Sequence, residues 1–150
     1  MRALVQRVKR CSVLVEGTQQ SSIETGMLIL LGVKNGDTES DAEYLAERCS
    51  SLRIFENETG KMNLSVKDVK GEAMVVSQFT LYGDTHKGNR PSYTDAAPPQ
   101  IAEALYNRFI SHLQKLVGDQ RVASGVFRAM MDIDLINDGP VTLMLESKNR

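Results

Sequence analysis

Hydrophobic and polar residues alternate in the first third of the chain, in the pattern of β-strands. The apolar positions fall within residues 3–8, 12–15 and 27–33, and Glu16-Gly17 and Thr25-Gly26 are turn signals between these segments. We therefore expect three short strands here. Further strands are expected at residues 53–56, 72–81, 121–127, 131–137 and 141–146.

Two segments have apolar residues at the three-and-four spacing of an amphipathic helix. Thr38 and Asp41 resemble a capping box, with Asp in place of Glu, that opens the first helix. Pro98-Pro99 suits the first turn of the second helix, because proline has no N–H to lose there, and Gly118 ends it. The predicted buried positions are Ala42, Leu45, Ala46, Cys49 and Leu52 in the first helix and Ile101, Leu105, Phe109, Leu113, Leu116 and Val117 in the second.

The order of these elements indicates the fold class. About nine short strands and two helices, with strands at both ends of the chain, predict an α+β fold. The sheet should be mostly antiparallel and barrel-like. With 150 residues, of which 41% are hydrophobic and 25% charged, the chain has the length and composition of a single globular domain spanning residues 1–150.

Composition and charge argue against several classes of protein. The longest unbroken apolar stretch, residues 27–31, is far too short to span a membrane, and no signal peptide is evident. The two cysteines and two histidines lack paired ligand spacing, which argues against a structural zinc site. A formal net charge of −1 gives no general basic field, so a nucleic-acid partner needs a local basic patch. Without an export signal or a disulfide framework, the protein is expected in the cytosol.

The segment Ser77-Gln78-Phe79-Thr80 lies at the end of the most apolar predicted strand. Polar residues in this place are typical of a strand that emerges into water. They are also typical of a site where free backbone N–H groups stabilise a developing oxyanion. A hydroxyl nucleophile in this segment would need a base, and nothing in the sequence brings His86 or His112 beside it.

Residues 137–142, with the sequence Asn-Asp-Gly-Pro-Val-Thr, are expected to form a hairpin loop between two strands. A hairpin does not require proline, and X–Pro bonds in tight turns are where cis peptides occur. The local sequence leaves both isomers of the bond between Gly139 and Pro140 open. A Gly-Pro pair presents carbonyl groups with little side-chain bulk, which suits a ligand that is contacted by backbone alone.

The segment of residues 82–99 has no periodicity, and a loop of this length in a compact domain is usually functional or mobile. It contains Lys87, Arg90 and Tyr93, a combination suited to phosphate and base contacts. The same composition also fits a solvated loop. We predict that Lys87 and Arg90 contact RNA phosphates.

Taken together, these motifs resemble those of the D-aminoacyl-tRNA deacylases. The resemblance rests on SQFTL at residues 77–81, on KG and RPS within residues 87–92, and on NDGPVT at residues 137–142. It extends through MRA and VQRV within residues 1–8, LGV at 31–33, LRIF at 52–55 and GKMNLS at 60–65. It therefore covers nearly the whole chain in the right order.

The resemblance implies a homodimeric cytosolic esterase that acts at the acceptor end of tRNA. Its substrates would be D-aminoacyl-tRNA and wrongly charged glycyl-tRNA. Ser77, Gln78, Phe79 and Thr80 would line the pocket for the terminal adenosine and the aminoacyl group. The cis pair Gly139-Pro140 would enter the pocket of the other subunit and reject L-amino acids. The resemblance implies no metal, no other cofactor and no membrane partner.

Three residues depart from the family pattern. Cys11 stands where Ala is expected, Glu146 replaces a usual Asp, and Arg128 follows Phe127 where glycine is usual. Of these, Arg128 is expected to add bulk and charge near the pocket.

The sequence leaves three hypotheses open. The leading one is the tRNA-editing esterase, in which a substrate ester already activated by the neighbouring ribose hydroxyl needs only positioning and oxyanion stabilisation. The second is a non-catalytic nucleic-acid-binding dimer that uses the loop of residues 87–93. The third is a hydrolase of small esters that uses Thr80 as nucleophile and forms a covalent acyl intermediate.

Overall fold

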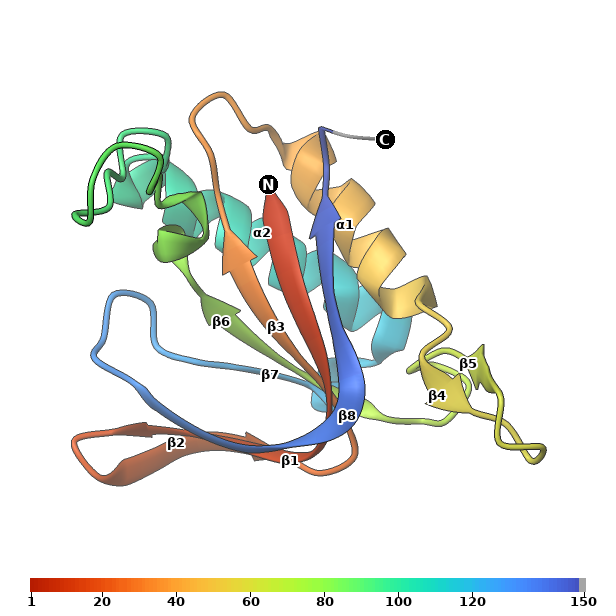
Figure 1. Cartoon of the computed structure of the whole chain (residues 1–150). Coiled ribbons are helices and arrows are strands. Elements are labelled where there is room, and N and C mark those ends of the chain that lie inside the picture. The colour runs from red at the N-terminus through yellow and green to blue at the C-terminus, as the bar shows by residue number, and fades with distance from the viewer. Residues whose placement is uncertain (149–150) are drawn as a thin grey trace.

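A strongly curved sheet is the centre of the fold (Figure 1). The computed structural model describes residues 1–148. The strands are β1 (Arg2–Val15), β2 (Thr18–Ile23), β3 (Gly26–Gly32), β4 (Phe55–Glu56), β5 (Met62–Leu64), β6 (Glu72–Ser77), β7 (Val122–Ser124) and β8 (Asp132–Glu146). The strand order in the sheet is β2-β1-β3-β6-β7, and β8 also pairs with β1. The α-helices are α1 (Glu39–Ser51) and α2 (Pro99–Val117), and the short 3₁₀ turns are η1 (Phe79–Tyr82) and η2 (Asp119–Arg121).

The predicted α+β class, with two helices and a barrel-like sheet, is confirmed. β1 pairs antiparallel with β2, β3 and β8, and β4 pairs antiparallel with β5. The pairs β3–β6 and β6–β7 are parallel, so the sheet is mixed. In Figure 1, β1 and β8 run side by side along their length and bend together, which gives the sheet its curl.

β3 and β6 lie in the middle of the sheet and contribute to a core on each face. Alternate residues of a strand face opposite sides, so each strand divides its side chains between the two cores. In β3, Ile29 belongs to the main core beneath α1 and α2, whereas Leu28 belongs to a second core shared with β1, β2 and β6. In β6, Val75 and Met74 divide in the same way. Burial on both faces explains the continuous apolar character of both segments.

Both helices begin where the sequence predicts. The capping box of α1 is present, with Thr38 and Asp41 in the expected roles. The predicted buried face of α2 is largely confirmed, but Ile101 is 51% exposed. The buried face passes through Ala102 and Leu105, which pack against the core, so Ile101 lies on the neighbouring exposed side. No helix within residues 1–148 is long and apolar enough to cross a bilayer.

Two predicted chain breaks are wrong for the same reason. Residues 3–8 and 12–15 belong to one strand, β1, and residues 131–137 and 141–146 belong almost entirely to one strand, β8. Both halves of β8 pair with β1. The register of this pairing shifts between Gln6 and Val8 and again between Val8 and Arg10, where bulges accommodate the residues that have no opposite partner. The segment of residues 137–140 is therefore the bulged middle of a strand and not a hairpin loop.

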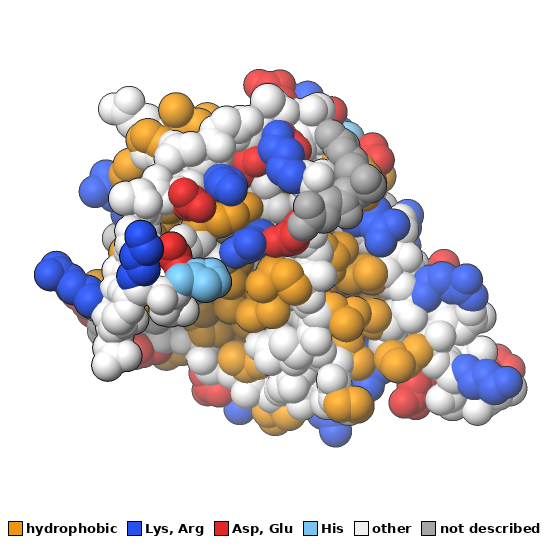
Figure 2. Space-filling view, turned by 45° about the horizontal axis from the view of Figure 1, so that its top comes forward, with side chains coloured by type: hydrophobic (Ala, Val, Ile, Leu, Met, Phe, Trp, Pro, Cys, Tyr) orange, Lys and Arg blue, Asp and Glu red, His pale blue; other side chains and the backbone are white. Residues whose placement is uncertain are grey.

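Strand β8 carries three exposed apolar side chains. Ile136, Leu143 and Met144 are 43%, 42% and 49% exposed. Hydrophobic side chains gather in the middle of the face shown in Figure 2.

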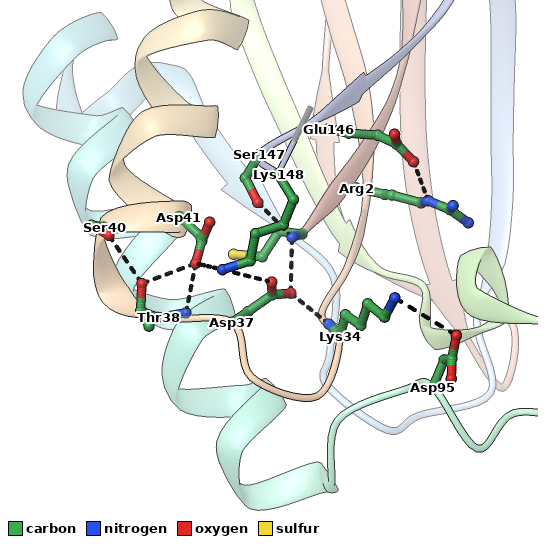
Figure 3. Close-up of polar contacts among 11 residues, drawn as sticks. Arg2, Lys34, Asp37, Thr38, Ser40, Asp41, Asp95, Glu146, Ser147 and Lys148 are labelled. Atoms are coloured by element: carbon green, nitrogen blue, oxygen red, sulfur yellow. Dashed lines mark hydrogen bonds and ion pairs between the residues drawn. The ribbon is translucent and has the colours of Figure 1, made fainter. Parts of the chain in front are cut away.

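A buried polar cluster joins the start of β1 to the residues that follow β8 (Figure 3). The α-ammonium group of Met1 lies 2.8 Å from Asp37 Oδ2 and donates a hydrogen bond of 2.7 Å to Ser147 Oγ. The side chain of Asp37 is fully buried. Burial lowers the pKa of the Met1 amine, and the contact with Asp37 offsets part of that effect.

Asp41 is the second buried carboxylate of this cluster. Its Oδ2 atom lies 2.8 Å from Lys148 Nζ and accepts hydrogen bonds of 2.9 Å from the Thr38 backbone N–H and hydroxyl. Burial by itself raises the pKa of Asp41, but the hydrogen bonds from Lys148 and Thr38 outweigh it and hold the pKa well below its ordinary value.

Candidate active site

The polar segment predicted at the end of β6 forms a tight turn. β6 ends at Ser77, and the Gln78 N–H donates a last hydrogen bond of 2.8 Å to the Leu31 carbonyl of β3. The prediction of a strand through residue 81 is wrong. β3 ends at Gly32, so its pairing with β6 stops at Ser77, and residues 79–82 form η1 instead. A Cβ atom on Gly32 would lie 3.1 Å from the Gln78 carbonyl oxygen, so glycine allows this turn to pack close.

Two backbone donors at this turn have no partner in the part of the chain that the structure describes. The Leu81 N–H donates to the Gln78 carbonyl and the Gly83 N–H to the Thr80 carbonyl. The N–H groups of Phe79 and Thr80 make no hydrogen bond within residues 1–148. The first N–H groups of any helical turn lack acceptors inside that turn. Adjacent free donors of this kind suit an oxyanion.

The structure brings the side chains of Gln78 and Thr80 together but gives them no base. Gln78 Nε2 donates to Thr80 Oγ1. His86 Nδ1 lies 2.5 Å from Asp84, and His112 Nε2 lies 3.4 Å from Glu47. Neither histidine makes a hydrogen bond with the turn in the described part of the chain, which disfavours an activated Thr80 nucleophile.

A pocket of about 630 Å³ opens beside this turn. It is lined by Leu31, Val33, Asn35, Ser77, Gln78, Phe79, Tyr93, Thr94, Ala96, Ala97, Pro98, Pro99, Ala102, Tyr106, Phe127 and Arg128. Three of the four predicted residues therefore reach the pocket, whereas Thr80 is not part of its lining. The walls are mostly apolar, and Arg128 is the one charged side chain among the described lining residues.

Tyr106 and Phe127, which the sequence did not single out, form part of the pocket wall. The Tyr106 hydroxyl donates a hydrogen bond of 2.9 Å to the Val75 carbonyl, and its ring lies 5.6 Å from that of Phe127. Burial raises the pKa of Tyr106 to about 12, so the phenol keeps its proton and its hydrogen bond. The sequence signal for Tyr106 is its place three positions before Phe109 on the buried face of α2.

Phe79 and Tyr93 close one side of the mouth. Their rings meet edge to face, with centroids 5.1 Å apart and an interplanar angle of 70°. A Cβ atom on Gly83 would lie 3.0 Å from the Tyr93 ring, so glycine at this position leaves room for the tyrosine. Tyr93 thus links the pocket to the loop that the sequence marked for RNA contacts.

Gly139 and Pro140 lie on the surface in the middle of β8, and the peptide bond between them is cis. Neither residue lines the pocket of its own chain. The Asn137 side chain spans the bulge, with Nδ2 donating to the carbonyls of Arg7 at 2.9 Å and Val141 at 3.2 Å.

The side chain of Arg7 also contacts this bulge, at Asp138. Its side chain is 6% exposed, and its Nη1 atom donates a hydrogen bond of 2.6 Å to the Ile54 carbonyl. Its Nε atom lies 3.2 Å from the Asp138 carbonyl oxygen and 3.1 Å from Asp138 Oδ2. Sequence patterning gave no signal for this role, because Arg7 reads as a polar position on an alternating strand.

Lys87 and Arg90 lie at the tip of a small loop. Two backbone hydrogen bonds, 2.7 and 2.9 Å long, join Asp84 and Ser92 and close its base. Lys87 and Arg90 are exposed, form no ion pair with any residue in 1–148, and do not line the pocket. The structure therefore leaves both cations available to a partner.

Comparison with known proteins identifies the family. The model of the D-Tyr-tRNA(Tyr) deacylase family matches residues 4–146. The chain belongs to this family. It is 55% identical to the D-aminoacyl-tRNA deacylase of Koribacter versatilis, with 99% of this chain and 98% of the relative aligned. It is 54% identical to that of Halalkalibacterium halodurans, with 99% and 100% aligned. The predicted membership is confirmed.

Two solved structures of similar fold extend the comparison. The c-Myc DNA Unwinding Element Binding Protein superposes with a TM-score of 0.93 at 43% identity, over 97% of this chain and 98% of the other. A probable eukaryotic D-amino acid tRNA deacylase superposes with a TM-score of 0.81 at 18% identity, over 97% and 98%. At that identity the second match supports the shared fold alone.

Proposed function

We propose that this protein hydrolyses the ester bond of D-aminoacyl-tRNA and releases the D-amino acid and free tRNA. The observation that carries the proposal is the pair of unpaired N–H groups on Phe79 and Thr80 beside a pocket of about 630 Å³. A pocket of this volume accommodates a nucleoside with an attached amino acid. Membership of the deacylase family and the names of its relatives support the same reaction.

The chemistry needs little more than these donors. A water oxygen bonds to the ester carbonyl carbon, and the carbonyl oxygen becomes an oxyanion that accepts hydrogen bonds from the two N–H groups. The bond between that carbon and the ribose oxygen then breaks, and the proton lost by water ends on the ribose oxygen. The neighbouring ribose hydroxyl is placed to pass that proton. No side-chain base is required.

Thr80 contributes mainly through its backbone in this mechanism, since its hydroxyl accepts a hydrogen bond from Gln78 and has no base beside it. Thr80→Ala should therefore keep a substantial share of the deacylation rate. Loss of a true serine nucleophile lowers kcat by about 10⁶-fold. A loss of that size, or an acyl adduct on Thr80 in mass spectrometry, would show that Thr80 is a nucleophile after all.

The finer part of the proposal concerns a second copy of the chain. Gly139 and Pro140 are exposed and lie outside the pocket of their own chain. The same strand carries the exposed side chains of Ile136, Leu143 and Met144. Exposed apolar side chains gathered on one strand suit a self-complementary interface. We place a second copy against β8, with Gly139-Pro140 of each copy entering the other's pocket.

Gly139-Pro140 would then act as the stereochemical filter. Arg7 and Asn137 hold the bulge from both sides, so its carbonyl groups form a stiff wall. A wall close to the substrate α-carbon excludes an L side chain by collision and admits a D side chain pointing the other way. Glycine has no side chain to collide, so glycyl-tRNA should also be hydrolysed.

The test is deacylation of D-tyrosyl-tRNA, L-tyrosyl-tRNA and glycyl-tRNA by the purified protein. We expect the first and third to lose their ester and the second to persist. Binding of all three without turnover would contradict the esterase and favour a nucleic-acid-binding protein, as the name of one structural relative indicates for that relative. Rapid hydrolysis of L-tyrosyl-tRNA would contradict the filter but leave the esterase standing.

The second copy is tested by sedimentation. Met144→Glu should convert a dimer to a monomer, because it places a charge among the exposed apolar side chains of β8. Met62→Glu is the matched control, since Met62 is 57% exposed and lies on β5, away from β8. A wild-type protein that sediments as a monomer would rule out the filter acting between subunits.

A further inference from the structure

Arg128 has a backbone conformation that ordinarily favours glycine. Its φ is 65°, and it is the third residue of a four-residue turn closed by a hydrogen bond of 3.1 Å from the Ala129 N–H to the Val126 carbonyl. A positive φ at the third position of a turn suits glycine, because a Cβ atom there crowds the backbone. Strained residues beside a pocket often serve the ligand, so the side chain of Arg128 is a candidate for substrate contact.

The surroundings of Arg128 point the same way. It is the one charged residue among the described residues that line the pocket, and it makes no ion pair or hydrogen bond within residues 1–148. The arginines with a carboxylate partner are Arg2, Arg7, Arg10 and Arg108. A guanidinium exposed at an apolar pocket, with no acidic neighbour in the lining, is available to an anion.

We propose that Arg128 binds the phosphate on the 5′ side of the terminal nucleoside of the tRNA. The inference rests on the proposed function, which places that nucleoside and its ester in the pocket. The RNA chain continues from the 5′ oxygen of the terminal ribose, so this phosphate must lie where the RNA leaves the pocket. A guanidinium binds two phosphate oxygens at once through its planar fork. Phe127 packs against Tyr106, which holds the turn of residues 126–129 and therefore the backbone of Arg128 in place.

A graded set of substrates isolates this contact. All carry the same D-tyrosyl ester: 3′-O-D-tyrosyl-adenosine, the same compound with a 5′-phosphate, and D-tyrosyl-tRNA. Arg128→Gly suits the positive φ while removing the charge. We expect it to raise KM about tenfold or more for the two phosphorylated substrates. Its KM for the adenosine compound should change much less, because that compound has no phosphate.

Three further variants separate charge from backbone. Arg128→Asn tolerates the left-handed conformation without a charge and should behave like Arg128→Gly. Arg128→Lys should recover part of the affinity, because it keeps the charge but loses the fork. The matched control is Arg48→Ala, which removes an exposed cation of α1 that lies outside the pocket. It should leave every KM unchanged.

A readout without turnover keeps the inference separate from the proposed function. The wild-type protein should bind adenosine 5′-monophosphate more tightly than adenosine in calorimetric titrations, and Arg128→Gly should abolish that difference. Equal binding of the two ligands by the wild-type protein, or an equal loss for the phosphorylated and unphosphorylated esters, would overturn the role of Arg128. Hydrolysis of none of the three esters by the wild-type protein would overturn the esterase, and the nucleotide titration would still decide the phosphate contact.

Discussion

The buried polar cluster and the region around the pocket use charged residues in opposite ways. In the cluster, Asp37 and Asp41 have side chains that are 0% and 1% exposed, and each faces a cation. Around the pocket, Lys87, Arg90 and Arg128 are exposed and have no ion-pair partner within residues 1–148. The first set has its charge satisfied by the fold, whereas the second set has charge available to a ligand.

The difference follows from desolvation. A buried carboxylate without a cation is strongly unfavourable, so the cluster depends on every member. Among residues 1–148, one carboxylate oxygen of Asp37 and one of Asp41 are buried without a hydrogen-bond partner, which leaves little to compensate a lost cation. An exposed cation is solvated by water and costs the fold almost nothing. Substitutions in the first set should therefore change stability, and those in the second should change binding.

The largest expected effect is loss of stability when the cluster is broken. Asp37→Asn keeps the size of the side chain but leaves the α-ammonium group of Met1 buried without its counter-charge. The free energy of unfolding should fall by about 3–5 kcal/mol, measured by urea denaturation. A change below about 1 kcal/mol would mean that the ammonium group finds other partners or solvent, and the contrast with the pocket would fail.

The next effect is a dependence of stability on pH through Asp41. Its pKa in the folded protein lies below the ordinary value of 3.8, so folding favours the ionised form. The stabilisation is complete above pH 3.8 and is lost as the pH falls from there towards the lower folded pKa. Asp41→Asn should remove this acid-sensitive stabilisation, so the urea midpoint should depend less on pH between pH 4 and pH 2. An unchanged slope in that window would assign the acid sensitivity to other groups.

A smaller, purely functional effect is expected for the loop cations. Lys87→Ala with Arg90→Ala should weaken tRNA binding and leave the urea midpoint unchanged. The slope of log K against log salt should become shallower by about 0.7–0.9 for each lost phosphate contact. If the slope is the same in the double variant, these residues are solvated charges and the RNA passes elsewhere.

The smallest effect is expected for an exposed ion pair between the two regions. Lys34 Nζ lies 3.8 Å from Asp95 Oδ2, and the two side chains are 46% and 61% exposed (Figure 3). Asp95→Asn should change the free energy of unfolding by less than about 0.5 kcal/mol. It serves as the exposed counterpart of Asp37→Asn, and a large effect here would show that burial does not separate the two sets.

Much of the fold was predictable because it depends on local signals. The capping box at Thr38 acts within one helical turn, and Gly118 ends α2 through its own positive φ of 119°. Strand pairing was harder, because it depends on a partner elsewhere in the chain. Residues 137–140 carry turn residues, yet β1 lies alongside and pairs with both flanking segments, so the turn signal produced a bulge.

The sequence by itself determined the α+β class, both helices and the motifs that mark the deacylase family, since periodicity, capping and short motifs are read from neighbouring residues. Only the tertiary structure decided that the N–H groups of Phe79 and Thr80 have no acceptor among the described residues, because this depends on where β3 ends beside β6. It also decided that Arg7 supports Asp138 across 131 residues of chain. These contacts form between distant segments whose approach is set by packing of the whole core, and no local pattern encodes them.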